Sequence, residues 1–328
     1  MQNLFDPAIL FFIFGVLAGF ARSNLEIPPA ISRFLSLYLL MALGLKGGFA
    51  LAHSGLSSQI GLSLGAAVVL AVIVPLVGYA ALRQFLSGFD AAAIAATYGS
   101  VSAVTFLTAT QFLENQAIPY GGHMAAAMAL MESPAIIIAV VFANRLRSSS
   151  LTNVATTSAT PEARPSSLGK ILHESFTDGA QLLLLGAMVV GLISGESGKA
   201  AMQPFTGELF KGMLSFFLLD MGLMASRNLP QLRGKSASLL AYAVLAPLAH
   251  ASLALGLCWT LQLPVGDSAL LMVLAASASY IAVPAVLRYA LPEANPSLYF
   301  GLSLGVTFPI NILAGIPFYT ALAQAVLG

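Results

Sequence analysis

Residues 90–105 read DAAAIAATYGSVSAVT, an alanine-rich run that turns midway into glycine, serine and threonine. Small residues at such a place let a membrane helix pack closely or unwind. A second stretch of this kind, ASASYIAVP, occupies 276–284, where Pro284 removes a backbone donor and breaks the helical hydrogen-bond ladder. Both stretches lie inside long apolar segments, so we expect two membrane helices that are interrupted midway. The alternative is that the small residues only pack one helix against another.

The composition indicates a protein whose solvent is largely lipid. Apolar residues make up 58% of the 328 residues and charged ones 8%, and the mean hydropathy is +0.88, whereas soluble domains carry about 25% charged residues. The net charge of +1 argues against a nucleic-acid partner. The one cysteine, Cys258, can form no internal disulfide and gives no metal signature. The sequence holds no phosphate-binding loop, dinucleotide fingerprint or nucleophile elbow, so we do not expect an enzyme.

Ten membrane-spanning helices are predicted, because a span needs about 20 mostly apolar residues. Five fall in a first repeat, 1–144, and five in a second, 173–328. Between them, residues 145–172 are rich in Ser, Thr, Ala and Pro, which is typical of a flexible linker. The first six residues hold no basic side chain, so we expect the first apolar run to be a retained span and not a cleaved signal. The predicted spans are 7–21, 30–52, 59–82, 91–112, 119–143, 176–194, 206–226, 237–262, 267–289 and 297–326.

The basic residues predict the orientation. If the N-terminus is outside, eleven of the 14 Lys and Arg residues fall on the cytoplasmic side, and only Lys46, Lys199 and Lys211 remain outside. Cytoplasmic loops carry such an excess of basic residues in membrane proteins. We therefore expect a multi-pass protein of the cell inner membrane, with both termini outside and the central linker in the cytoplasm.

The two halves of the chain resemble each other in a fixed order. Because five spans is an odd number, a repeated unit must enter the membrane upside down the second time. Inverted repeats are typical of secondary transporters, whose substrate sites lie near the membrane midplane at interrupted helices. The sequence thus predicts an all-α membrane protein with a 5+5 inverted repeat and an interrupted fourth span in each half. The matching stretches are LMALGL (40–45) with LLDMGL (218–223), VPL around Pro75 with APL around Pro247, 96–104 with 276–284, and MESPA (131–135) with VTFPI (306–310).

The interrupted helices are the predicted binding site. The N-terminus of a half-helix presents backbone N–H groups that favour an anion. Freed carbonyl and hydroxyl oxygens favour a hard cation such as Na⁺. The candidate anion-binding residues are Gly99, Ser100, Ser102, Thr105, Ser277, Ser279 and Tyr280. The candidate Na⁺ ligands are Glu132, Ser102, Ser279 and Thr307.

Three charged residues lie well inside the apolar stretches of predicted spans, where a charge is costly and usually functional. Glu132 precedes Pro134 in the fifth span. It is expected either to coordinate a cation or exchange protons, or to form a structural ion pair. Lys46 and Asp220 occupy similar levels in the two halves. Either they pair across the repeat axis, or Lys46 only extends toward the outer surface.

Seven motifs carry a resemblance to a known family: LEIPPAI (25–31), LGLKGGFA (43–50), DAAAIAATYGSVSAVT (90–105), IPYGGHMAAAMALMESPA (118–135), LFKGMLS (209–215), APLAH (246–250) and LRYALPEANPSLYFG (287–301). Over roughly residues 10–328 the chain resembles the sodium-dependent bicarbonate transporters best known from cyanobacteria. The resemblance implies a ten-helix inverted fold, a homotrimer, and Na⁺-coupled uptake of bicarbonate bound between the interrupted helices. It also implies a PII-like regulatory partner, although the linker here is much shorter than in the cyanobacterial members.

The chain departs from the family pattern at several places, and Ala103, Val104, Ala282 and Val283 replace glycines and serines of the two breaks. Tyr280 stands where the family has an aspartate that would be a natural sodium ligand, Glu132 takes the place of another aspartate, and Lys46 replaces a threonine. The leading hypothesis is a secondary transporter that carries bicarbonate or a similar small monoanion into the cell by Na⁺-coupled symport and alternating access. The alternatives are an H⁺-coupled or uncoupled transporter of another small anion or carboxylate, and a non-transporting membrane sensor of the same fold.

Overall fold

The computed structural model describes residues 5–54, 57–152, 179–232 and 234–328, and the regular structure within them is helical. The predicted helices of the first half are present, with their ends moved by a few residues. The fourth is divided in two, as the small residues of 90–105 indicated. The helices are α1 (Pro7–Phe20), α2 (Pro29–Ser54), α3 (Ser58–Leu82), α4 (Gly88–Gly99), α5 (Ala103–Asn115) and α6 (Met124–Thr152).

The second half repeats this order and also has a divided fourth helix. Its last helix is continuous from Pro296 to Leu327 but contains two π-helical segments. The elements are α8 (Gly179–Gln203), η2 (Pro204–Glu208), α9 (Leu209–Asn228), η3 (Leu229–Leu232), α10 (Ala237–Leu261), α11 (Val265–Ala276), α12 (Ala282–Ala290), α13 (Pro296–Leu302), η4 (Ser303–Thr307), α14 (Phe308–Ile310), η5 (Asn311–Gly315) and α15 (Ile316–Leu327).

Two predicted boundaries around the centre of the chain change. Helix α6 begins at Met124, not at 119, and continues to Thr152, so residues 145–152 of the predicted linker are helical. The rest of that linker lies outside the described residues. Helix α8 extends beyond 194 to Gln203, but Gly195 has φ 55° and ψ −144°, which kinks the helix there. Glycine adopts this conformation because it has no Cβ.

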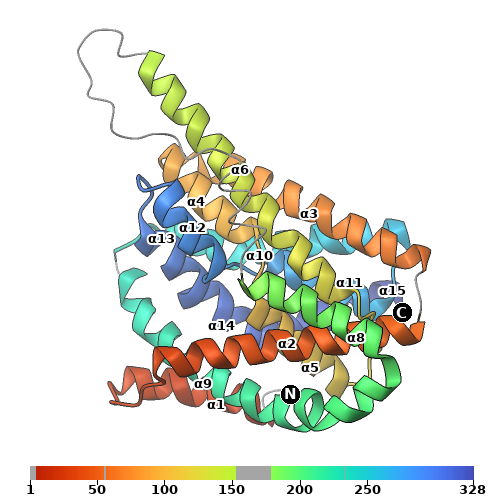
Figure 1. Cartoon of the computed structure of the whole chain (residues 1–328). Helices are drawn as coiled ribbons and strands as arrows, with labels where there is room; N and C mark the ends of the chain where they lie inside the picture. The colour runs from red at the N-terminus through yellow and green to blue at the C-terminus, as the bar shows by residue number, and fades with distance from the viewer. Residues whose placement is uncertain (1–4, 55–56, 153–178, 233) are drawn as a thin grey trace.

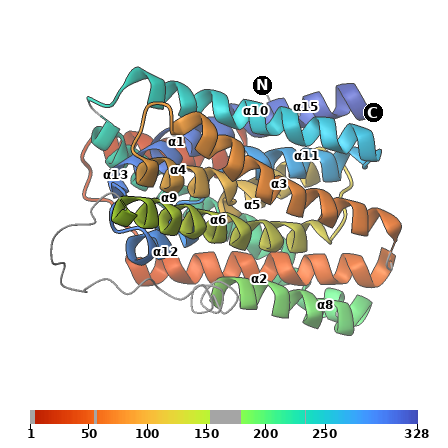
Figure 2. The same ribbon diagram turned by 90° about the horizontal axis from the view of Figure 1, so that it is seen from above.

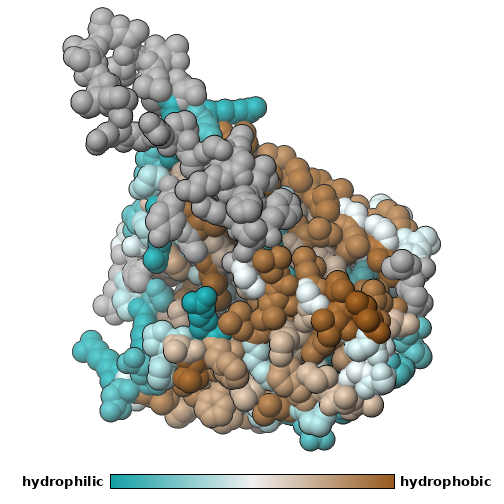
Figure 3. Space-filling model, in the orientation of Figure 1, coloured by the Kyte–Doolittle hydropathy of each residue, from teal (hydrophilic) through white to brown (hydrophobic). Residues whose placement is uncertain are grey.

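The surface is that of a protein embedded in lipid. Seven helical stretches are long and apolar enough to cross a membrane, and α1 and α11 are shorter apolar helices. Large apolar side chains point outward from α1, α3, α8 and α10, among them Ile193, which is 81% exposed. In Figure 3 hydrophobic side chains cover the middle of the visible face, and hydrophilic ones gather toward its edges. The chain is a multi-pass membrane protein.

The four helices α1, α2, α8 and α9 form one layer, in which α2 packs along α8 and α1 along α9 (Figures 1 and 2). Each pair joins a helix of the first half to one of the second. A Cβ at Gly48 would lie 2.1 Å from the Met188 carbonyl oxygen, and a Cβ at Gly222 would lie 2.2 Å from that of Phe12. Only glycine fits at such distances, so glycines set how closely these helix pairs approach.

The interrupted helices lie inside the protein, beside this layer (Figure 2). Helix α4 from Ala91 to Gly99 is buried, and so is α11 from Gly266 to Ala276. Each of these first arms has 12 residues and an aspartate in its third position, Asp90 and Asp267. Counted from these aspartates, Ser102 and Ser279 occupy the same position in the two halves. Counted from the first arms, the alignment of 96–104 with 276–284 is shifted by three residues.

The two aspartates tie each first arm to a loop of the other half. The Asp90 carboxylate accepts a hydrogen bond of 2.8 Å from the backbone N–H of Asn295, just before α13. The Asp267 carboxylate accepts one of 2.6 Å from the N–H of Gly121, just before α6. Both first arms are therefore fixed at their outer ends, so that the breaks at their inner ends take defined positions.

Candidate functional site

The two helix breaks are bonded directly to each other. The first break comprises residues 100–102, between α4 and α5, and the second comprises 277–281, between α11 and α12. The backbone N–H of Ser102 donates to the Ser277 hydroxyl over 2.9 Å. The N–H of Ser279 donates to the Thr97 carbonyl oxygen over 2.8 Å. Backbone groups freed by each break thus find partners in the other, as they must inside a membrane.

Serine hydroxyls occupy the N-terminal ends of α5 and α12, which are the second arms of the two interrupted helices. The Ser102 hydroxyl oxygen accepts from the N–H of Thr105 over 3.2 Å and from its hydroxyl over 2.9 Å. The Ser279 hydroxyl oxygen accepts from the N–H of Val283 over 3.3 Å. The remaining N–H groups in the first turn of each helix have no partner within that helix. The N-termini of α5 and α12 therefore each present positive potential near a serine.

A cavity of about 210 Å³ lies beside the two breaks. The first residues of both second arms line it, together with polar side chains from α2, α6 and α8 and several apolar ones. Its lining residues are Ser36, Leu40, Val101, Ser102, Ala103, Val104, Met128, Glu132, Ile136, Ala180, Gln181, Leu184, Ser279, Tyr280, Ile281, Ala282 and Val286. We call this space the break cavity.

Tyr280 brings an unused polar group to the break cavity. Only 5% of the residue is exposed, and its hydroxyl, although near the Ser102 side chain, makes no hydrogen bond of good geometry among the described residues. Its ring lies edge-on against Phe308, with the ring centroids 5.2 Å apart, which fixes the side chain. A buried hydroxyl without a partner costs about 1–3 kcal/mol. An oxygen atom of a bound ligand would remove that cost.

The polar wall of the break cavity joins α6 to α8. The Glu132 carboxylate accepts a hydrogen bond of 2.8 Å from the side-chain amide of Gln181. This contact is with a neutral amide group. Gln181 did not stand out in the sequence, although a glutamine between 179 and 194 is a polar residue in an apolar run.

The other candidate anion-binding residues lie behind the cavity wall. Thr105 and Ser277 support Ser102 through the hydrogen bonds already described. The Ser100 hydroxyl is buried and has no hydrogen-bond partner among the described residues. A Cβ at Gly99 would lie 2.5 Å from the ring of Pro75, so this glycine serves the packing of α4 on α3.

Comparison with known families identifies the chain. The model of the Na⁺-dependent bicarbonate transporter superfamily matches residues 7–324. The chain belongs to this superfamily. It is therefore a membrane transporter and not an enzyme. A search of curated proteins finds no match.

The superfamily name includes Na⁺, and three of the four candidate Na⁺ ligands lie together. Glu132, Ser102 and Ser279 line the break cavity and offer oxygen atoms, which suit a hard cation. Thr307 does not line it. Its hydroxyl donates to the Ala243 carbonyl oxygen over 2.7 Å and is 2.6 Å from the Tyr98 hydroxyl. These bonds hold the last helix against α4 and α10.

Asn311 supports the second break from outside the break cavity, and the sequence reasoning missed it. Its side-chain amide donates to the carbonyl oxygen of Ala276, the last residue of α11, over 2.8 Å. The Tyr319 hydroxyl donates back to the Asn311 side-chain oxygen over 3.1 Å. A helix end buried in a membrane protein needs such a partner. The signal in the sequence is an asparagine within the apolar run PINILAG, 309–315.

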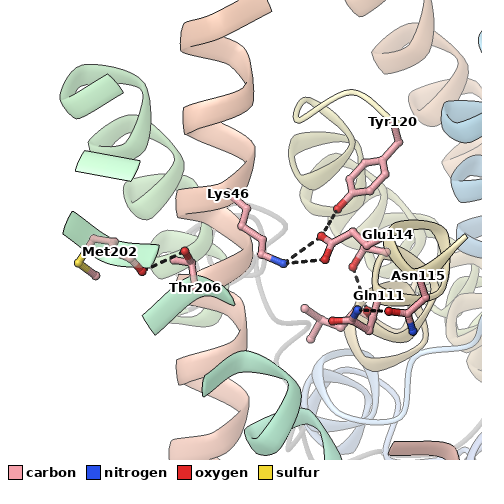
Figure 4. A network of polar contacts seen from close by, with 9 residues as sticks. Lys46, Gln111, Glu114, Asn115, Tyr120, Met202 and Thr206 are labelled. Atoms are coloured by element: carbon pink, nitrogen blue, oxygen red, sulfur yellow. Dashed lines mark hydrogen bonds and ion pairs between the residues drawn. The ribbon is translucent and has the colours of Figure 1, made fainter. Parts of the chain in front are cut away.

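Lys46 does not pair with Asp220, which was one of the two alternatives that the sequence left open. The Lys46 ammonium contacts both oxygens of Glu114 on α5, over 2.9 and 3.1 Å, whereas Asp220 accepts a hydrogen bond from the Ser32 hydroxyl. Figure 4 shows Lys46 pointing from α2 toward Glu114, which the Tyr120 hydroxyl also contacts, over 2.9 Å. Sequence position gave the level of Lys46 in the membrane but not the helix that faces it.

Proposed function

We propose that this protein carries bicarbonate or a similar small monoanion across the membrane together with Na⁺, and that the break cavity is the binding site. The single observation that carries the proposal is that the N-termini of α5 and α12 open into one cavity, with Ser102, Ser279 and Tyr280 at their ends. Two helix N-termini favour an anion. The Tyr280 hydroxyl supplies a further donor that lacks a partner.

In this proposal the anion binds to the donors of the second arms, and Na⁺ binds to the oxygens of Glu132, Ser102 and Ser279. The positive charge of Na⁺ and the negative charge of the anion then stabilise each other in a site shielded from water. Tyr280 donates to the anion, and Glu132 carries the negative charge for the cation. Gln181 holds the Glu132 carboxylate in place by its hydrogen bond.

We infer that the two halves form a 5+5 inverted repeat, with each half entering the membrane in the opposite sense. Three features support it. The first helix of each half packs against the second helix of the other half, in the pairs α1–α9 and α2–α8. The first arms α4 and α11 have equal length. Asp90 and Asp267 each hold a loop of the other half.

The predicted orientation, with both termini outside, remains part of the proposal. It is supported by the distribution of basic residues. The homotrimer and the PII-like regulator stay predictions from the resemblance.

Transport by the purified protein in liposomes tests the proposed function. We expect uptake of ¹⁴C-bicarbonate under an inward Na⁺ gradient, none with K⁺ in its place, and loss of uptake in Ser102→Ala and Ser279→Ala. Ser63→Ala is the matched control, because Ser63 is a buried serine without a hydrogen-bond partner among the described residues and lies outside the cavity. Uptake driven by a pH gradient without Na⁺ would favour proton coupling. Binding without accumulation against a gradient would favour the sensor.

A second candidate cargo is a small carboxylate with an alkyl group. The observation that favours it is the apolar part of the break cavity, formed by residues such as Leu40, Val104 and Met128. Bicarbonate has no apolar group that would use these walls, whereas acetate and pyruvate each have a methyl group. Inhibition of ¹⁴C-bicarbonate uptake by added acetate, pyruvate or unlabelled bicarbonate distinguishes the cargoes. If the cargo bears a methyl group, acetate or pyruvate inhibits at a lower concentration than unlabelled bicarbonate.

A further inference from the structure

A second cavity lies at the other end of α2, around the Lys46–Glu114 pair. Its volume is about 330 Å³. It is formed by the C-terminal part of α2, the end of α5 and the turn before α6 on one side, and by α8 and η2 on the other. Its lining residues are Leu43, Lys46, Gly47, Phe49, Ala50, Phe106, Glu114, Tyr120, Gly122, Ala125, Lys199, Gln203, Thr206 and Gly207.

The charges of this cavity favour an anion. Two ammonium groups, Lys46 and Lys199, line it against one carboxylate, Glu114, which leaves a formal charge of +1. Lys199 contacts Glu196 over 3.5 Å, but both side chains are more than half exposed, so this pair is weak. The side-chain amide of Gln203 is a further donor.

The Lys46–Glu114 pair is open to a competing anion. The Lys46 side chain is 23% exposed and that of Glu114 34%, so solvent reaches both. The ammonium also lies 4.4 Å from the centre of the Phe210 ring, which holds it in place if Glu114 moves away. Glu114 keeps a second partner, Tyr120, whose pKa is raised by burial and by the Glu114 charge, so that its hydroxyl stays a donor. An anion that takes Lys46 therefore leaves neither side chain without a contact.

The second cavity and the break cavity lie along the same two helix faces. On α2, Leu40 lines the break cavity, and Leu43 and Lys46 line the second one. On α6, Met128 lines the break cavity and Ala125 the second one. Residues three or four apart share one face of a helix. The two spaces thus follow one another between α2 and α6.

We propose that the second cavity is an anion-binding site, at which a small monoanion displaces Glu114 from the Lys46 ammonium before it reaches the break cavity. The identity of the anion and its direction of travel rest on the proposed function. The binding of an anion by Lys46 does not, because the lysine and the cavity are independent of the helix breaks.

Equilibrium binding of ¹⁴C-bicarbonate and ¹⁴C-acetate to the purified full-length protein tests this site. Ser102→Ala removes the break site, so binding that remains belongs to the second site. In that background we expect Lys46→Met to abolish the remaining binding. We expect Glu114→Gln to tighten it about tenfold, because the competing charge is gone while Tyr120 keeps a hydrogen-bond acceptor. Lys211→Met is the matched control and should change nothing, since Lys211 is exposed and lines neither cavity.

The outcomes separate the two proposals. If Lys46→Met and Glu114→Gln lower thermal stability but leave anion affinity unchanged, the pair is structural and the second site is wrong. If Lys46→Met abolishes all binding while Ser102→Ala binds like the unchanged protein, the second site stands and the break site fails. If Ser102→Ala alone abolishes all binding, the second site is wrong and the break site stands.

Discussion

The backbone N–H of Ser102 donates to the hydroxyl of Ser277 over 2.9 Å, so the break in one interrupted helix supplies the partner for the break in the other. Both residues are buried. Neither break can change its conformation without exposing a polar group of the other to an apolar surrounding. The two half-helix N-termini are thereby held toward the same cavity, which is what a shared anion site requires.

Ser277→Ala should destabilise the protein by about 1–3 kcal/mol, because it leaves the Ser102 N–H buried without an acceptor. Unfolding in mixed micelles measures the change. Ser303→Ala is the control. Ser303 is equally buried, but its hydroxyl donates only within its own helix, to the carbonyl oxygens of Tyr299 and Phe300. An equal loss of unfolding free energy in the two variants would show that the hydrogen bond between the breaks stabilises the protein no more than one within a single helix.

Tyr280→Phe should separate binding from stability. The hydroxyl has no hydrogen-bond partner among the described residues, so its removal should leave the free energy of unfolding unchanged or slightly higher. Anion affinity should fall about tenfold, the effect of losing one hydrogen bond to a charged group. Tyr242→Phe is matched, because its hydroxyl is also buried without such a partner but lies outside the cavity. Thermal unfolding and anion titration of both variants give the comparison. Unchanged affinity in Tyr280→Phe would remove Tyr280 from the site.

Gly48→Ala should weaken the packing of α2 on α8. The new Cβ would meet the Met188 carbonyl oxygen at 2.1 Å, so the helices must move apart, at a cost of about 1–3 kcal/mol. Gly186→Ala, on α8 itself, is the control, because a Cβ there meets nothing within 4 Å. That substitution should stabilise the helix by up to about 1 kcal/mol. Thermal unfolding in detergent measures both, and a Gly48→Ala protein as stable as the parent would contradict the close approach.

The ion pair of Glu293 and Arg147 should give a small dependence of stability on pH. The Nε and Nη2 groups of Arg147 each donate a hydrogen bond of 2.8 Å to the Glu293 carboxylate. These bonds lower the pKa of Glu293, which lies in the loop before α13. A lowered folded-state pKa contributes stability above the ordinary glutamate pKa of about 4.3, and the contribution is lost as pH falls through the lower value.

Glu293 is partly exposed, so the contribution should be at most about 1 kcal/mol. Comparing the melting temperature of Glu293→Gln with that of the parent from pH 7 to pH 3.5 checks it. The difference should be largest near pH 7 and shrink toward pH 3.5. A difference that stays constant over this range would assign the effect to the shape of the side chain and not to its charge.

The sequence by itself determined that the chain is an all-helical membrane protein with a divided fourth helix in each half. Helices in lipid satisfy their own backbone groups, so apolar length predicts them without tertiary contacts. The glycines, serines and Pro284 of 90–105 and 276–284 marked where the hydrogen bonds of the helical backbone are interrupted. The same local signals pointed to Ser102, Ser279, Tyr280 and Glu132, which line one cavity.

Only the tertiary structure decided which polar groups contact one another. Asn311 reaches Ala276, Gln181 reaches Glu132, and Lys46 pairs with Glu114 and not with Asp220. Each contact joins helices far apart in the sequence, and its geometry depends on how those helices turn about their axes when they pack. Hydropathy and residue type carry no information on that rotation, because lipid and protein interior are equally apolar.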